Sequence, residues 1–333
     1  MSVSTVPLAP QGTLRDYLRL ARFDHVTKQI FILPGIVLAL MLREAPEGPL
    51  WPAIVLGLAA AVAIASANYV INEWLDRAFD AHHPEKSARA AVQKRLDARL
   101  VYGLYAALLG AGLGLAAAVN PTMLWLAALF AVAGVAYNVQ PVRAKDRAYV
   151  DVLAESLNNP IRLMLGWAMV DPASLPPVSL LLAFWFGGAF LMNAKRLAEY
   201  RFIVATSGHE VLARYRRSFA VYDETRLSVA NLIHALLCGF CMAVFLVKYR
   251  IEYVLLFPFV TALFAEYYRI SLLMGSAARA PERLFEARRL MLLTLATGLA
   301  FVVTSLVDVP ALERLADQHF IELPARGMGG GMP

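Results

Sequence analysis

The sequence predicts an all-α protein that crosses a membrane several times, and three observations support this. Of its 333 residues, 59% are hydrophobic, and the mean hydropathy is +0.57. Charged residues make up 17%, whereas about a quarter is usual in soluble domains. Apolar runs long enough to span a bilayer recur along the chain, with polar breaks between them. Such a chain cannot expose its apolar surface to water, and we predict a polytopic membrane protein.

Nine apolar runs are candidates for membrane spans. Each approaches the roughly twenty residues that a helix needs to cross the hydrocarbon core. We place them at residues 28–43, 51–72, 98–119, 121–138, 149–170, 176–197, 225–247, 251–274 and 288–308. They divide the chain into an N-terminal segment (1–27), a transmembrane domain that would carry any catalytic site (28–308), and a C-terminal tail (309–333). We expect part of this tail to be disordered.

The N-terminal segment contains a further helical pattern. Over residues 13–23, basic and apolar residues alternate at helical spacing, which is typical of an amphipathic helix on a membrane surface. An ordinary cytosolic helical turn fits this pattern as well. Residues 1–12 are polar and contain proline, so the segment lacks the pattern of a cleavable signal peptide.

Basic residues gather in alternate loops, and this gives the chain an orientation. The poorly charged loops contain little more than Arg43, Lys248 and Arg250. By the positive-inside rule, the basic loops place the N-terminus in the cytoplasm, and an odd number of spans places the C-terminus outside. We therefore predict a multi-pass protein of the cell (inner) membrane. The basic loops contain Arg15, Arg19, Arg22 and Lys28; Lys86, Arg89, Lys94 and Arg95; Arg143, Lys145 and Arg147; Arg201, Arg214, Arg216 and Arg217; and Arg279, Arg283, Arg288 and Arg289.

Several other classes of protein are disfavoured. The net charge of +6 follows from the loops that set the topology, so we expect no nucleic-acid partner. Cys238 and Cys241 lie inside an apolar run, where we expect packing residues and no disulfide. The sequence contains no Walker loop, no GxGxxG motif, no zinc-type spacing of His and Cys, and no Ser-His-Asp pattern.

A polar motif closes the second apolar run. Asn72, Asp76 and Asp80 recur every four residues, which places all three on one face of a helix. Carboxylates at the mouth of a membrane helix are costly unless they are paired, hydrated or bound to metal. Hard oxygen ligands of this kind suit Mg²⁺. We predict that these residues form a magnesium site on the cytoplasmic side.

The loop that follows this motif carries groups suited to phosphate. Lys86 and Arg89 could hold phosphate oxygens, and His83 could donate a hydrogen bond. A loop that only sets topology is the alternative, but its position beside the carboxylates favours ligand binding. Tyr137 ends the fourth run and Lys145 follows in another basic loop, and we assign both to substrate binding.

The fifth run carries a polar stripe inside an apolar segment. A stripe of this kind must face a water-filled cavity or other polar helices. Because it contains both acids and an arginine, we favour a cavity, while a structural network between helices is the alternative. The stripe consists of Asp151, Glu155, Asn158, Asn159 and Arg162.

The sixth run ends in a cluster of charges. Lys195 and Glu199 are four residues apart and could pair on a helix, with Arg196 beside them. Charges at a helix end often only extend toward the interface. Here they lie on the same predicted side as the carboxylate motif, which favours a role in the site.

The motif Asn72-x3-Asp76-x3-Asp80, with its nine spans, resembles the UbiA-type intramembrane prenyltransferases over about residues 14–308. The resemblance implies nine helices around a cavity open to lipid, and an aspartate-rich motif that binds Mg²⁺ and a diphosphate. Common members carry a second aspartate-rich motif after the sixth span. This sequence has Lys195-Arg196-x2-Glu199 there instead.

Further details are similar to one branch, the polyprenyl-phosphate phosphoribosyltransferases, which include the decaprenyl-phosphate enzyme of arabinan precursor synthesis for the cell wall. The supporting patterns are His83-Pro84-x-Lys86-x2-Arg89 and the spacing of Asp151, Arg162 and Gly166. Two positions depart from this branch. Glu73 stands where Asp is usual, and Ala90 stands where Pro usually follows the arginine.

The resemblance implies transfer of 5-phosphoribose from phosphoribosyl diphosphate (PRPP) to a polyprenyl phosphate, with Mg²⁺ as cofactor and release of diphosphate. PRPP has two separated anionic ends, so one end can bind carboxylates through the metal while the other needs cations. The alternatives are a prenyltransferase that uses a prenyl diphosphate and a small aromatic acceptor, and a membrane transporter that uses the polar stripe as its pathway.

The implied roles divide the residues into groups. Asn72, Asp76 and Asp80 would hold Mg²⁺ and the leaving diphosphate. Glu73 would contact the metal or the ribose hydroxyls, and Lys86 and Arg89 would bind the diphosphate. Lys195 and Arg196 would bind the 5-phosphate, oriented by Glu199. Asp151 and Arg162 would line the cavity, with Arg162 on the acceptor phosphate.

Overall fold

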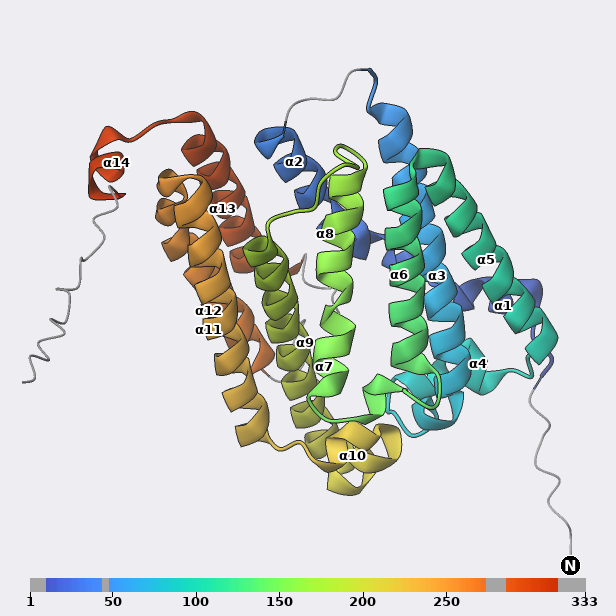
Figure 1. Cartoon of the computed structure of the whole chain (residues 1–333). Helices are drawn as coiled ribbons and strands as arrows, with labels where there is room; N and C mark the ends of the chain where they lie inside the picture. The colour runs from blue at the N-terminus through green and yellow to red at the C-terminus, as the bar shows by residue number, and fades with distance from the viewer. Residues whose placement is uncertain (1–9, 44–47, 274–285, 317–333) are drawn as a thin grey trace, which may run out of the picture.

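The computed structural model describes residues 10–43, 48–273 and 286–316. Over these residues the regular elements are helices, which confirms the all-α prediction (Figure 1). The elements that frame the site are α3 (Trp51–Asp80), α6 (Pro121–Asn138), α7 (Val150–Ser156), α8 (Asn158–Ala168) and α9 (Val178–Ser207). The others are α1 (Leu14–Leu20), η1 (Phe23–Ile32), α2 (Leu33–Leu42), η2 (Lys86–Ala88), α4 (Ala90–Gln93), α5 (Ala98–Val119), η3 (Ala144–Asp146), α10 (His209–Tyr215), η4 (Arg217–Ala220), α11 (Glu224–Tyr249), η5 (Ile251–Leu256), α12 (Phe257–Ser271), α13 (Arg288–Leu306) and α14 (Pro310–Ala316), where η marks a 3₁₀ helix.

Eight helical segments in the described part of the chain are long and apolar enough to cross a membrane. They are Leu14–Leu42, Trp51–Asp80, Ala98–Val119, Pro121–Asn138, Val178–Ser207, Glu224–Tyr249, Ile251–Ser271 and Arg288–Leu306. The predicted span at 149–170 is missing from this set because it is divided into α7 and α8, which follow one another between α6 and α9 (Figure 1). The predicted total of nine spans depends on counting this broken pair as one.

Proline explains the break between α7 and α8. Pro160 has no backbone N–H, and its ring clashes with the carbonyl of the residue four positions earlier, Ser156. Helix α7 ends at that residue, and α8 begins at Asn158. The break therefore leaves the polar side chains of the predicted stripe on two short helices instead of one.

The N-terminal segment is more structured than its sequence suggests. Helix α1 has an exposed apolar side, with Leu14 76% exposed, while Leu20 is fully buried. The chain then turns at Arg22, which has a left-handed backbone (φ 48°), and enters η1. The first predicted span, at 28–43, thus begins earlier and combines a 3₁₀ helix with α2. Whether α1 lies on the membrane surface stays a prediction.

Close packing fixes η1 and α2 against α8. A Cβ atom on Gly166 would lie 2.1 Å from the carbonyl oxygen of Ile32, and one on Gly35 would lie 2.1 Å from that of Leu163. Glycines at these two positions allow the backbones to approach, as is common between membrane helices. This contact holds Arg162, one turn before Gly166, beside η1.

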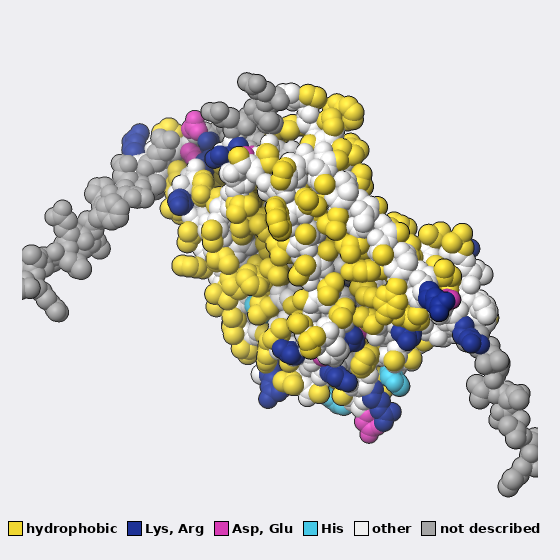
Figure 2. All heavy atoms as spheres, turned by 45° about the vertical axis from the view of Figure 1, so that its right-hand side comes forward, with side chains coloured by type: hydrophobic (Ala, Val, Ile, Leu, Met, Phe, Trp, Pro, Cys, Tyr) yellow, Lys and Arg dark blue, Asp and Glu magenta, His cyan; other side chains and the backbone are white. Residues whose placement is uncertain are grey.

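The surface agrees with a membrane-embedded bundle. Figure 2 shows hydrophobic side chains over the middle of one face, with most of the Lys and Arg side chains toward its lower end. That end is where α4 and α10 lie in Figure 1. Of the predicted loop cations, Arg279 and Arg283 lie outside the described residues, as does the tail from residue 317 onward.

Candidate active site

One large cavity lies inside the bundle, with a volume of about 430 Å³. Its walls come from η1, α3, α6, α8 and α9 and from the loops at the basic end of the molecule. Ten Lys or Arg residues and five Asp or Glu residues line it, so its walls carry a positive net charge. The cations are Arg22, Lys28, Lys86, Arg89, Arg143, Lys145, Arg162, Lys195, Arg196 and Arg216, and the acids are Asp76, Asp80, Glu85, Asp146 and Glu155.

The three residues of the predicted metal motif lie on the cavity side of α3. Asn72, Asp76 and Asp80 all line the cavity, as the four-residue spacing predicts. The Asn72 side-chain amide donates to Asp76 Oδ2 at 3.2 Å and to Asn138 Oδ1 at 2.6 Å. The Asp80 carboxylate accepts a hydrogen bond from Arg89 at 2.8 Å. The carboxylates are therefore held by protein donors.

Two cations from the loop after α6 neutralise Asp76. Its Oδ1 atom lies 2.9 Å from an Arg143 nitrogen and 2.5 Å from Lys145 Nζ. Burial lowers the pKa of Lys145 to about 8, and Asp76 offsets only part of this effect. Lys145 also donates to Asn138 Oδ1 at 2.8 Å. Lys145, which was predicted to bind substrate, thus contacts Asp76 of the metal motif directly.

The oxygen atoms of this motif suit a hard cation. Among the described residues, no group of three or more His, Cys, Asp or Glu side chains is placed to hold a metal by itself. However, Asn72 uses its nitrogen in both hydrogen bonds, and Asp80 uses only Oδ2, so an oxygen of each lacks a donor from the described side chains. Mg²⁺ is commonly held by one or two carboxylates together with substrate phosphates. The donor set fits a magnesium ion shared with an anionic ligand.

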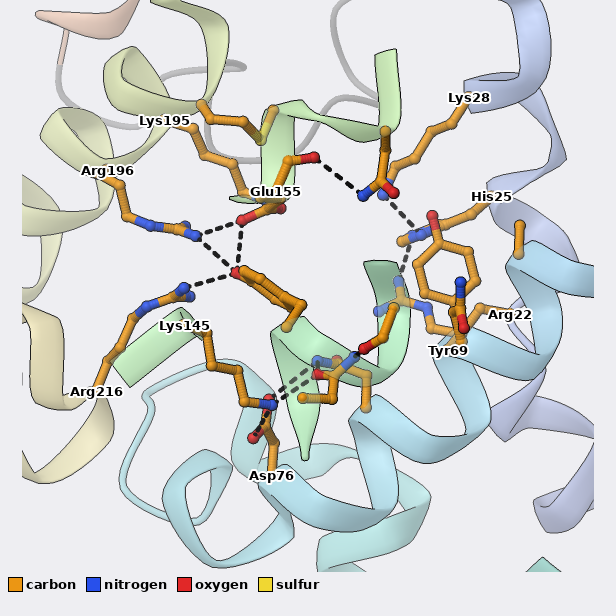
Figure 3. A pocket seen from close by; sticks show the side chains of 18 of the residues that line it. Arg22, His25, Lys28, Tyr69, Asp76, Lys145, Glu155, Lys195, Arg196 and Arg216 are labelled. Atoms are coloured by element: carbon orange, nitrogen blue, oxygen red, sulfur yellow. Dashed lines mark hydrogen bonds and ion pairs between the residues drawn. The ribbon is translucent and has the colours of Figure 1, made fainter. Parts of the chain in front are cut away.

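At the end of α9, Arg196 and Lys195 behave differently. The Arg196 guanidinium is buried and forms ion pairs with Asp151 at 3.2 Å, Glu155 at 2.5 Å and Glu199 at 3.5 Å. Lys195 lines the cavity and points into it (Figure 3), and it forms no ion pair or hydrogen bond with the residues that the structure describes. The predicted pairing of Lys195 with Glu199 is not formed, because Glu199 is taken by other cations.

Glu199 is the centre of a buried cluster that holds the loop after α3. It accepts from Lys86 at 2.8 Å and from the Tyr215 hydroxyl at 2.9 Å, and His83 Nε2 lies 3.4 Å away. His83 Nδ1 in turn accepts from the backbone N–H groups of Glu85 and Lys86 at 3.1 Å each. Burial raises the pKa of Tyr215 to about 12. Burial alone would lower the pKa of Lys86, but Glu199 and Tyr215 raise it, and the net shift is upward.

Four predicted site residues lie behind the cavity wall instead of on it: Glu73, His83, Asp151 and Glu199. Glu73 forms ion pairs with Arg22 at 3.3 Å and Arg89 at 3.6 Å. Asp151, predicted to line the cavity, is fully buried. The physical reason is that a buried cation needs a buried counter-charge. The three acids therefore position cations that do reach the cavity, while His83 holds the backbone at Glu85 and Lys86.

Asp151 connects its neighbouring segments through ion pairs and hydrogen bonds. Besides Arg196, its carboxylate accepts hydrogen bonds from Ser218 at 3.1 Å and Tyr222 at 2.5 Å, and it lies 3.4 Å from Arg216. The Tyr137 hydroxyl joins the same network by donating to Glu155 at 2.7 Å. Tyr137 itself lines the cavity, as predicted for a substrate-binding residue.

Arg162 lies deeper in the bundle than the metal motif and is 8% exposed. Its Nε donates to Gln29 Oε1 at 3.1 Å, and its guanidinium lies 5.2 Å from the centre of the Phe130 ring. It forms no ion pair with any residue that the structure describes. Nearby on α8, the buried Oδ1 of Asn158 lacks a hydrogen-bond donor. Arg162 and Asn158 both line the cavity, as predicted.

Several lining residues were not assigned to the site from the sequence: Arg22, His25, Lys28, Arg143, Glu155 and Arg216. Arg22, Lys28, Arg143 and Arg216 were used only to orient the chain, Glu155 was part of the polar stripe, and His25 was given no role. For Arg143 and Glu155, a signal that could have found them is their closeness in sequence to Lys145 and Asp151, which were assigned to the site.

The fold and the cavity define a multi-pass membrane protein with a charged internal site suited to anionic ligands. A model of the UbiA prenyltransferase family matches residues 32–296, and the chain belongs to this family. This agrees with the resemblance found in the sequence. No curated protein matches the chain significantly.

The chain has the same fold as solved structures of UbiA homologues. A homologue from Archaeoglobus fulgidus bound to DMAPP and Mg²⁺ is 22% identical, with a TM-score of 0.66 over 88% of this chain and 100% of that one. The same homologue bound to GPP and Mg²⁺ is 23% identical, with a TM-score of 0.65 over 87% and 99%. A structure described in a study of digeranylgeranylglyceryl phosphate synthase is 16% identical, with a TM-score of 0.60 over 88% and 98%.

Proposed function

We propose that this protein transfers 5-phosphoribose from PRPP to a polyprenyl phosphate in a reaction that needs Mg²⁺ and releases diphosphate. The active site would face the cytoplasm from the inner membrane. The observation that carries this proposal is the charge of the cavity, where ten cations face five acids. These substrates bring three anionic groups into one site: a diphosphate, a 5-phosphate and the phosphate of the lipid.

The end of the cavity near Asp76 and Asp80 suits the diphosphate. Mg²⁺, when bound there, would stabilise the negative charge that develops on the leaving group. Arg89, Arg143 and Lys145 now lie against these carboxylates. If a cation took over the carboxylates, the same donors would be left to bind phosphate oxygens. Lys86, held in place by Glu199, would support the diphosphate from the neighbouring loop.

Lys195 suits the 5-phosphate. It points into the cavity (Figure 3) and has no ion pair among the described residues. Its neighbour Arg196 is held by three carboxylates. We therefore assign phosphate contact to Lys195 and a positioning role to Arg196. The hypothesis from the sequence assigned phosphate binding to both side chains, and we now assign it to Lys195 alone.

Arg162 suits the phosphate of the acceptor. A charged side chain within a membrane span costs about 3 kcal/mol or more unless it is paired. The described residues offer Arg162 no carboxylate, so an anionic ligand is the partner that its position favours. The acceptor phosphate is already ionised, so no strong general base is needed. One of its oxygens would attack the anomeric carbon while the bond from that carbon to the diphosphate breaks.

A second candidate is transfer of a prenyl group from a prenyl diphosphate to a small acceptor. It is favoured by the family and by the DMAPP and GPP found in the solved homologue. It is disfavoured by the basic character of Lys195 and Arg196, since a prenyl chain offers them no second anion. Membership of a transferase family also disfavours the transporter alternative.

A transfer assay tests the proposal. Purified protein would be incubated with Mg²⁺, farnesyl or decaprenyl phosphate and PRPP labelled in its ribose carbons, because the β-phosphorus leaves with the diphosphate. We expect label in the lipid extract, and none when the lipid phosphate is replaced by the free alcohol. Absence of label from the lipid with the phosphorylated acceptor would refute the proposal.

A further inference from the structure

A second pocket lies on the outer side of α3 and has a volume of about 400 Å³. The last turns of α3 form one wall, and α4 with the residues that follow it forms the other. Helical periodicity separates this pocket from the cavity, because Asp76 and Asp80 face the cavity while Trp74 and Arg77 lie on another face of the same helix. We call this second site the outer pocket.

The charged side chains of the outer pocket are all basic. They are Arg77, Lys94 and Arg95, and no Asp or Glu that the structure describes lines the pocket. The Arg77 guanidinium lies 3.8 Å from the centre of the Trp74 ring and donates to the Trp74 carbonyl at 2.5 Å. None of the three cations forms an ion pair with a described residue. The outer pocket therefore carries a positive charge that its own walls do not neutralise.

The acids of the adjoining segments are used by other donors. On α1, Asp16 interacts electrostatically with Lys94, but its carboxylate accepts from the Thr13 hydroxyl at 2.8 Å and lies 3.7 Å from Arg19. Asp97 caps the start of α5 by accepting from a backbone N–H there at 2.8 Å. A ligand that neutralises the outer pocket must therefore bring its own negative charge.

The backbone that carries these cations is fixed by the fold. The N–H of Arg95 donates to the carbonyl of Pro10 at 3.0 Å, and the carbonyl of Arg95 accepts from the N–H of Gly12 at 2.9 Å. Two residues later, the N–H of Asp97 donates to the Tyr17 hydroxyl at 2.8 Å. The segment after α4 is thus attached to the N-terminal part of the chain, which holds its basic side chains beside α3.

The outer pocket lies where α3 would leave the membrane. The apolar run of this helix ends at Ile71, so Trp74 and Arg77 follow it at the level of the lipid headgroups. Trp is enriched at this level in membrane proteins. Helix α1 packs against α3 and α4 on this side (Figure 1) and exposes Leu14 and Leu18. A ligand with an anionic head and acyl chains fits this combination of charge and apolar surface.

We propose that the outer pocket binds the headgroup of an anionic phospholipid from the surrounding membrane. Lys94 and Arg95 would contact its phosphate, and Arg77 would complete the site beside Trp74. The phosphate diester supplies a negative charge and oxygens that accept from Lys and Arg, and basic clusters beside a membrane helix attract anionic lipids. A zwitterionic lipid brings a cation of its own among these three charges and binds more weakly. The site is separate from the cavity and does not depend on the reaction catalysed there.

Lipid binding to the full-length protein in detergent tests this site. Phosphatidylglycerol and phosphatidylcholine with the same acyl chains would be titrated, and bound lipid would be measured by native mass spectrometry. The double variant Lys94→Gln/Arg95→Gln removes two cations of the pocket, and Lys94→Arg/Arg95→Lys keeps the charge. The matched control Arg147→Gln/Arg214→Gln removes two exposed cations from other basic loops, outside the outer pocket. Size-exclusion profiles and thermal unfolding in phosphatidylcholine would identify any variant that does not fold.

We expect the parent protein to bind phosphatidylglycerol about tenfold or more tightly than phosphatidylcholine. Lys94→Gln/Arg95→Gln should weaken phosphatidylglycerol binding about twentyfold, since each Lys or Arg near an anionic lipid contributes about fivefold, and should change phosphatidylcholine binding less than about twofold. Phosphatidylglycerol should also raise the Tm of the parent protein more than that of this variant, because a ligand of the folded state stabilises it. The charge-keeping variant and the matched control should bind both lipids like the parent protein.

Four results would overturn the proposal. Equal affinity of the parent protein for the two lipids would show that the headgroup charge is not recognised, and unchanged phosphatidylglycerol binding in folded Lys94→Gln/Arg95→Gln would place the lipid elsewhere. The same loss in Arg147→Gln/Arg214→Gln would indicate attraction to the overall charge instead of a site. Displacement of phosphatidylglycerol by inorganic phosphate at equal concentration would indicate a site for soluble phosphate.

Discussion

At the metal-motif end of the cavity, Arg89, Arg143 and Lys145 all lie against carboxylates of α3, whereas at the deeper end Arg162 has no carboxylate partner among the described residues. The first region is neutralised by its own side chains, so a ligand must exchange with internal ion pairs, and in the proposed function a bound metal ion would favour that exchange. The second region is already short of negative charge. We therefore expect ligand binding near Asp76 and Asp80 to depend on a divalent metal, and ligand binding near Arg162 to be independent of it.

Removal of divalent metal gives the largest expected difference between the two ends. With EDTA in excess, we expect transfer to be abolished and PRPP binding to weaken about tenfold or more, because the diphosphate then competes with Asp76 and Asp80 for the same cations. Farnesyl phosphate binding should change less than about twofold. Equilibrium binding of each ligand, with and without Mg²⁺, measures this. An equal loss of affinity for PRPP and for farnesyl phosphate would show that the two ends of the cavity do not differ in their dependence on metal.

Replacement of the carboxylates is expected to reduce turnover about a thousandfold. Asp76→Ala and Asp80→Ala each remove an oxygen ligand from the motif, and loss of metal-assisted charge stabilisation has effects of this order. Single-turnover rates with labelled PRPP measure the effect. Glu210→Ala, at an exposed position at the start of α10, is the control and should keep the parent rate. Full activity of either aspartate variant would show that the motif does not hold the reacting group.

At the deeper end, we expect Arg162→Met to lower kcat/KM for the lipid acceptor about a hundredfold, as for the loss of a buried charged contact. The KM for PRPP should stay within about twofold. Lys248→Met is the control, since Lys248 is exposed and lies 5.9 Å from the centre of the Tyr249 ring, outside the cavity. Steady-state kinetics with each substrate varied in turn separates the two effects. A loss confined to PRPP would reassign Arg162 to the donor.

The smallest expected effect is at Lys195. Lys195→Met should raise the KM for PRPP about tenfold with little change in kcat, because its contact to the 5-phosphate is made in both ground and transition states. Lys195→Arg should restore most of the affinity by keeping a positive charge. The same kinetic measurements apply. A fall in kcat without a change in KM would indicate that Lys195 acts on the reacting centre instead.

Much of the fold follows from local sequence. Span positions and the placement of Asn72, Asp76 and Asp80 on one face depend on hydrophobic runs and four-residue spacing, which are properties of a single helix. The division of α7 from α8 also has a local cause, Pro160, although the periodic polar stripe around it suggests one continuous helix.

Partners between distant segments could not be predicted in the same way. Glu199 binds Lys86, which lies 113 residues earlier, and this pairing depends on how α9 packs against the loop after α3. The cavity-lining residues Arg22, His25 and Lys28 were not assigned to the site for a different reason. Their spacing of three residues matches the turn of a 3₁₀ helix, whereas the polar stripe predicted from the sequence follows the period of an α-helix.

The most direct test of the proposal that the cation-rich cavity binds a sugar-phosphate donor is a competition between the two donors in one reaction. Purified protein in lipid nanodiscs would receive Mg²⁺, ribose-labelled ¹⁴C-PRPP and ³H-geranyl diphosphate at equal concentration, with farnesyl phosphate and 4-hydroxybenzoate as acceptors. We expect ¹⁴C in the phosphorylated lipid and no ³H in an aromatic product. Tritium in the aromatic product without ¹⁴C in the lipid would contradict a sugar-phosphate donor and establish the prenyl donor in its place.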